Sequence, residues 1–68
     1  MAELASTFVT TTNRLIRSKG WTRTELASRM GVPLPHVSRW LSGRHQPRLN
    51  TVELFAKALG VKPDSLLR

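Results

Sequence analysis

The residues most able to do chemistry in this chain are arginines, and they are concentrated in one stretch. Of the 11 Lys and Arg residues in 68 positions, eight lie between positions 14 and 48, where Glu25 is the one acid. The formal net charge of +7 therefore lies entirely in the middle of the chain. A guanidinium group forms paired hydrogen bonds with phosphate and with the guanine edge. This concentration favours a polyanion as partner, above all nucleic acid.

Two other interpretations of the charge are a solvated surface and an anionic membrane. Gly and Pro residues interrupt the basic stretch, so it does not form one long amphipathic helix of the kind that lies on membranes. No apolar run approaches the roughly 18–20 residues of a membrane span. The first four residues, Met1 to Leu4, lack the basic and apolar parts of a signal peptide. We expect a cytoplasmic protein with no membrane partner.

Catalytic and metal-binding constellations are missing from the sequence. The chain has no cysteine, which excludes disulfides and cysteine-containing zinc sites. His36 and His45 are nine residues apart with no acid nearby, a poor metal pair. No nucleophile–base pair, paired carboxylates or phosphate-binding Gly loop is visible. We expect no metal, no cofactor and no enzymatic activity.

The elements that position the arginines are predicted to be short helices. There is no alternating strand pattern, and apolar residues recur at helical spacing between Gly and Pro punctuation. We expect residues 1–68 to form one all-α domain of five helices. The expected pieces are Ser6 to Lys19, Arg23 to Met30, a helix from Pro35 that stops at Gly43, a helix ending at Gly60, and a last turn from Pro63 to Leu67.

Capping signals fix the ends of these pieces. Thr22 and Glu25 match a capping box, and Trp21 with Leu26 matches a hydrophobic staple. Gly31 is a typical helix stop. For the fourth piece, Asn50 with Glu53 is a second possible capping box, and Arg48 is the alternative N-cap.

The second and third pieces are two short helices joined by a tight turn, Gly31 to Pro33. This is the helix-turn-helix pattern, here over about residues 22–42. Such a turn holds the second helix steeply against the first. The second helix can then enter the DNA major groove, which is about 12 Å wide and admits one α-helix.

The sequence resembles the phage-repressor (Cro/cI, Xre) type of helix-turn-helix, over about Phe8 to Leu67. The matching segments are 21–32 (WTRTELASRMGV), 37–44 (VSRWLSGR), Pro47 and 56–61 (AKALGV). The resemblance implies a compact five-helix, lambda-repressor-like domain that binds operator DNA. It also implies a symmetric homodimer, at least on DNA, in the cytoplasm of a bacterium or phage-infected cell, associated with the nucleoid.

The resemblance also implies roles for individual residues. Arg39 is the strongest base reader, because arginine bonds guanine O6 and N7 together. Arg23 stands where the family usually has a phosphate-binding Gln, and His45 is expected in a loop near phosphate. For Arg14 and Arg17 the sequence does not decide between a phosphate contact and a solvated side chain. Arg29 is expected to be solvated. The full set of expected base contacts is Leu34, Pro35, His36, Ser38 and Arg39, and the expected phosphate contacts are Thr22, Arg23, Ser42, Arg44 and Arg48.

The sequence departs from the family pattern in two places. Pro33, Leu34 and Pro35 replace the polar start of the recognition helix, so readout there is apolar, through thymine methyl groups, or weak. Ile16 and Leu41 stand where many members pair an Arg with a Glu. Two packed aliphatic side chains can replace a buried ion pair without loss of stability, so we hypothesise a direct contact between them.

The leading prediction is a sequence-specific regulator of transcription that binds double-stranded DNA and represses by covering its operator. The alternative is an antitoxin-like or adaptor protein whose main partner is another protein. RNA binding is a weaker option, because Trp21 and Trp40 fall on apolar faces and are expected to pack in the core rather than stack on bases. Leu54 and Val61 are expected at the surface, either as part of a dimer patch or as isolated exposed side chains.

Overall fold

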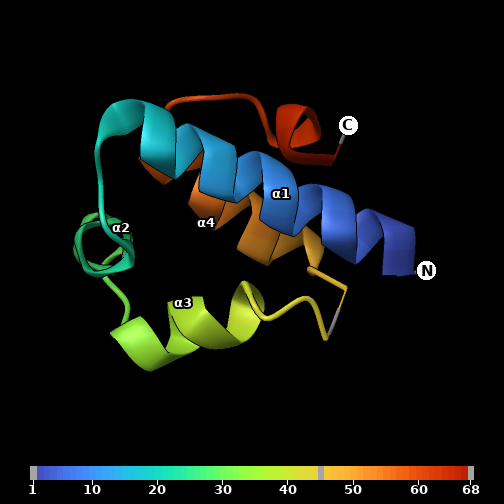
Figure 1. Ribbon diagram of the computed structural model, residues 1–68, viewed down its shortest axis with the longest axis horizontal. Coiled ribbons are helices and arrows are strands. Elements are labelled where there is room, and N and C mark those ends of the chain that lie inside the picture. Colours follow the sequence, from blue (N-terminus) through green and yellow to red (C-terminus); the bar gives the residue numbers. More distant parts are fainter. Residues whose placement is uncertain (1, 45, 68) are drawn as a thin grey trace.

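Four α-helices and a terminal 3₁₀ helix follow one another along the chain (Figure 1). They are α1 (Ala2–Lys19), α2 (Arg23–Met30), α3 (Leu34–Trp40), α4 (Leu49–Leu59) and η1 (Pro63–Leu67). The computed structural model describes residues 2–44 and 46–67, with side chains from Ser6 onward. Within these ranges the chain has no strand, so the predicted all-α class and its five pieces are confirmed.

The helices are arranged around α4. It contacts α1, α2 and η1, while α3 packs on α2 and η1 returns to α1. Figure 1 shows α1 and α4 side by side, with α3 on the opposite side of the molecule from η1. The helix that carries the predicted base contacts is thus held at one edge of the molecule.

The apolar faces of all five elements meet in one core. Phe8 of α1 and Phe55 of α4 form its centre, with ring centroids 5.0 Å apart in an edge-to-face arrangement. Ile16 and Leu41 are both buried in this core, although their direct contact stays a hypothesis. The core consists of Phe8, Ile16, Leu26, Ala27, Val37, Leu41, Val52, Phe55, Ala56, Leu59 and Leu66.

One polar side chain in this core is unsatisfied. Thr12 is fully buried, and its hydroxyl has no hydrogen-bond partner among the described residues. A buried hydroxyl without a partner loses its hydration and gains nothing in return. Thr12 therefore lowers the stability of the fold.

Helix α2 begins and ends where the sequence predicts. The Thr22 hydroxyl accepts a hydrogen bond from the Glu25 backbone N–H at 3.1 Å, as in a capping box. Gly31 has the left-handed backbone conformation, with φ of 73°. The next residue, Val32, donates its N–H to the Ala27 carbonyl at 3.1 Å and closes the helix end.

The predicted boundaries of two other helices are wrong by a few residues. Helix α1 begins at Ala2 rather than Ser6, because Ala2, Glu3, Leu4 and Ala5 are all good helix formers. Helix α3 begins at Leu34 rather than Pro35 and ends at Trp40, before Gly43. Proline is tolerated in a first turn, where its missing N–H has no partner to lose.

The predicted capping box at Asn50 and Glu53 is wrong, and the alternative start is confirmed. Arg48 is the N-cap of α4, and its carbonyl accepts the first helical bond, from the Val52 N–H at 2.9 Å. Thr51 and Val52 are buried in the first turn of α4, so tertiary packing fixes the helix start two residues earlier than the motif suggests. The last turn, Pro63–Leu67, lies where it was predicted, in 3₁₀ form.

Candidate nucleic-acid interface

Helix α3 has a buried side and an exposed side. Val37, which has no exposed surface, and Leu41, at 3% exposed, fix it to the core. The five residues predicted to contact bases are all exposed: Leu34, Pro35, His36, Ser38 and Arg39. The structure therefore leaves all five side chains of α3 accessible to solvent.

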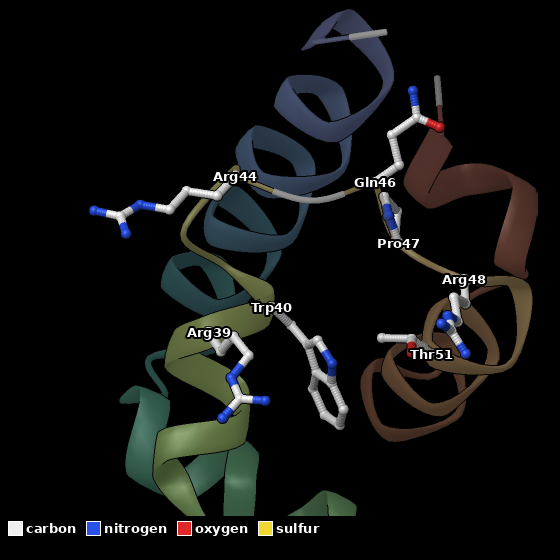
Figure 2. A pocket seen from close by; sticks show the side chains of 7 residues that line it. All are labelled: Arg39, Trp40, Arg44, Gln46, Pro47, Arg48 and Thr51. Carbon is white, nitrogen blue, oxygen red and sulfur yellow. The ribbon is translucent and has the colours of Figure 1, made fainter.

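Three arginines of the predicted interface surround a hollow between the end of α3 and the start of α4. Arg39, Arg44 and Arg48 line it, and its volume is about 510 Å³. Figure 2 shows Arg39 and Arg48 on either side of the Trp40 indole, with Arg44 directed outward. The structure describes no ion pair for these three arginines in residues 2–44 and 46–67, so their charges are available to an anion. The remaining lining residues are Trp40, Gln46, Pro47 and Thr51, which the sequence did not single out for this surface.

Ser42 organises the turn after α3. Its hydroxyl donates a hydrogen bond to the Arg39 carbonyl at 2.7 Å and accepts one from the Arg44 backbone N–H at 3.3 Å. The hydroxyl hydrogen is thus used within the protein, and the turn that carries Arg44 is held in shape. The phosphate contact predicted for Ser42 remains a prediction.

The start of α2 carries the other predicted phosphate contacts. Thr22 and Arg23 are exposed, and the cap uses the Thr22 oxygen as acceptor, which leaves the hydroxyl hydrogen able to donate. Arg23 shares a hollow of about 330 Å³ with Arg17 and Asn13 of α1. Arg14 lines a different hollow, between α1 side chains such as Thr7 and Thr10. Arg17 therefore lies near the predicted phosphate contacts, and Arg14 does not share their hollow.

Two cations lie over the ring of Trp21, which the sequence did not predict. The Lys19 ammonium is 5.2 Å from its ring centroid, and the Arg29 guanidinium carbon is 4.1 Å away. These are cation–π distances. Arg29 was expected in solvent; it is exposed but packs on the indole. Residues 21 and 29 lie eight positions apart, so no helical spacing rule could have paired them.

Trp21 and Trp40 were predicted to pack in the core, and the structure places both half-buried against it. The Trp40 ring centroid is 5.7 Å from that of Phe55 and 5.8 Å from that of His36. The four-residue spacing of His36 and Trp40 was a signal that the sequence offered for this pair. Trp40 also forms part of the hollow described above.

Three further predictions concern the position of His45, a metal site and a membrane span. The predicted loop position of His45 lies outside the described residues. In residues 2–44 and 46–67, no group of three or more His, Asp or Glu side chains could hold a metal ion. No helix in this part of the chain has both the length and the apolar character needed to cross a membrane.

Comparison with known proteins identifies the class. The helix-turn-helix family model HTH_3 matches residues 13–66. A solved structure of a hypothetical transcription factor, NHTF, from Neisseria matches 96% of this chain and 75% of its own, with a TM-score of 0.87 and 31% identity. No curated protein matches the sequence.

The chain therefore belongs to the helix-turn-helix family of the Xre/cI type, and the predicted resemblance is confirmed. The family match supports a DNA-binding regulator of transcription. Proteins of this class are typically not enzymes.

Proposed function

We propose that this protein is a sequence-specific repressor that binds double-stranded operator DNA and blocks access of RNA polymerase to the promoter. The observation that carries the proposal is the two-sided character of α3. Val37 and Leu41 fix one side in the core, while the opposite side presents exposed side chains to solvent. A helix held in this way at an edge of the molecule has the form needed to enter the major groove. Such a protein acts in the cytoplasm, on the nucleoid.

Base reading is assigned to the exposed side of α3. Arg39 reads guanine, because its guanidinium group bonds O6 and N7 together. His36 and Ser38 bond base edges, and Leu34 and Pro35 contact thymine methyl groups. Leu34 is 39% exposed, which leaves enough apolar surface for such a contact.

Phosphate contacts are assigned to both flanks of α3. Thr22 and Arg23 lie at the start of α2, and Ser42, Arg44 and Arg48 lie in the segment between α3 and α4. Contacts on both flanks fix the register of the protein on the duplex without carrying sequence information. The charges of Arg44 and Arg48, for which residues 2–44 and 46–67 offer no described ion pair, suit this role.

We infer a homodimer on DNA. Two copies that each carry +7 repel one another in solution, whereas the duplex that both copies bind neutralises that charge. A dimer of this kind reads two half-sites separated by about 34–36 Å, one turn of the duplex.

Selection from random duplexes, followed by affinity measurements at two salt concentrations, tests the proposal. Arg39→Ala should cost roughly 1–3 kcal/mol on the selected site and relax the preference at one base pair. Arg44→Ala should weaken binding to all sequences alike and lower the salt slope by about 1.

Lys62→Ala is the matched control, because it removes one positive charge from the residue before η1, and η1 lies on the opposite side of the molecule from α3 (Figure 1). Equal losses on selected and random DNA for both arginine variants would contradict the assignment of roles. Absence of any selected sequence would contradict the proposed function.

A further inference from the structure

A row of four aromatic rings connects the core to the exposed side of α3. Phe8 packs on Phe55 with centroids 5.0 Å apart, Phe55 on Trp40 at 5.7 Å, and Trp40 on His36 at 5.8 Å. All three separations lie in the range where aromatic rings attract one another. The row begins at two rings with almost no exposed surface and ends at one that is exposed.

The orientation of the His36 ring therefore depends on the core. Phe8 and Phe55 are at most 1% exposed and are held by close packing. Phe55 meets the Trp40 ring edge-on, at an interplanar angle of 72°, which leaves Trp40 to support the imidazole one helical turn earlier. For the exposed side chains of Ser38 and Arg39, the described part of the chain contains no such support.

We propose that Trp40 is a positioning residue that holds the His36 imidazole ready to read a purine in the major groove. This inference rests on the proposed function and names the base class that His36 recognises. A neutral imidazole has one N–H donor. Both purines present N7 as an acceptor in the major groove, cytosine presents only a donor there, and thymine places its O4 acceptor beside a C5-methyl group, so N7 is the acceptor we assign to His36. A side chain ordered before binding loses less conformational entropy when the bond forms.

The test compares base preferences of the full chain and its variants on a library of duplexes. The wild type should prefer a purine over a pyrimidine at one position of one strand, and His36→Ala should lower that preference roughly three- to tenfold, as for one hydrogen bond. Trp40→Leu keeps apolar bulk but removes the ring, so it should lower the same preference by a similar factor. Trp40→Phe keeps a ring and should restore most of it.

The double variant His36→Ala, Trp40→Leu separates positioning from general stability. It should lose no more preference at this base pair than His36→Ala alone, because the two residues act on one contact. The base pair read by Arg39 should keep its preference in Trp40→Leu. A loss spread evenly over all base pairs, an unchanged purine preference, or multiplied losses in the double variant would each overturn the inference.

A measurement without DNA tests the ring contact itself. In a Trp21→Phe background Trp40 is the one tryptophan, and His36→Ala should change its fluorescence emission while the protein stays folded. Unchanged emission would overturn the inference even if Trp40→Leu proves too unstable to assay.

The outcomes also separate the two proposals. If the wild type selects a sequence and Arg39→Ala relaxes it, but His36→Ala alters no base preference, the inference is wrong and the proposed function stands. If the wild type selects nothing, the proposed function is wrong.

Discussion

The two helices of the helix-turn-helix are stabilised in different ways. Helix α2 has a side-chain cap at Thr22 and a left-handed glycine at its end. Helix α3 begins after Pro33 with no side-chain cap and ends at Leu41, which is not a glycine. Val37 and Leu41 are buried, so α3 is held by the core rather than by its own sequence. Local sequence signals fix the ends of α2, whereas α3, which carries the proposed base contacts, depends on the rest of the fold.

The largest expected effect tests how strongly the end of α3 depends on the core. Ile16→Arg should destabilise the domain by at least about 3 kcal/mol, because Ile16 is 5% exposed and the new charge has no partner there. Denaturant unfolding measures the loss, and Ile16→Leu should cost less than about 1.5 kcal/mol. An unchanged melting temperature for Ile16→Arg would disprove the hypothesis that Ile16 packs against Leu41.

The next effect measures the packing of α3 directly. Val37→Ala removes two methyl groups from a side chain with no exposed surface, which should cost about 2 kcal/mol in unfolding free energy. Ser38→Ala, at the exposed neighbour, is the control and should stay within about 0.5 kcal/mol. If both variants unfold at the same denaturant concentration, α3 is not held by its buried side.

The C-terminal stop of α2 should matter less. Gly31→Ala places a Cβ on a residue with φ of +73°, where nothing lies within 4 Å, so backbone strain is the whole effect. The expected cost is about 1 kcal/mol. Gly31→Asn is the matched variant and should recover part of the loss, since asparagine tolerates this conformation better. Equal stability of wild type and Gly31→Ala would show that the helix end can move.

The smallest effect concerns the N-terminal cap of α2. Thr22→Ala removes the acceptor of the 3.1 Å bond from Glu25 and should cost about 1 kcal/mol or slightly less in unfolding free energy. Thr22→Ser keeps the acceptor and should be close to wild type. A loss in Thr22→Ala larger than that in Val37→Ala would reverse the comparison between the two helices.

The same contrast explains which parts of the fold could be predicted from the sequence. The bounds of α2 follow from Thr22 and Gly31, whose effects are confined to one turn of chain. The start of α4 did not follow from its motif, because burial of Thr51 and Val52 decides between Arg48 and Asn50. Sequence motifs therefore predict a helix end that is fixed by capping hydrogen bonds. They fail for a helix end that is fixed by tertiary packing.

The candidate site likewise has features that the sequence predicts and features that only the fold shows. The resemblance to the family implies five exposed side chains on α3, and the structure leaves all five exposed. The hollow beside Trp40 and the packing of Trp40 on Phe55 join α3 to α4. Fifteen positions separate these two rings, so only the folded chain brings them together.

Thr12 shows that this natural sequence is not optimised for resistance to heat. Its hydroxyl lies in the core without a partner. Valine has almost the same shape and carries a methyl group in that place, so Thr12→Val should make the domain tolerate higher temperatures. Since Thr12 is fully buried, the exchange leaves the surface that meets other molecules untouched.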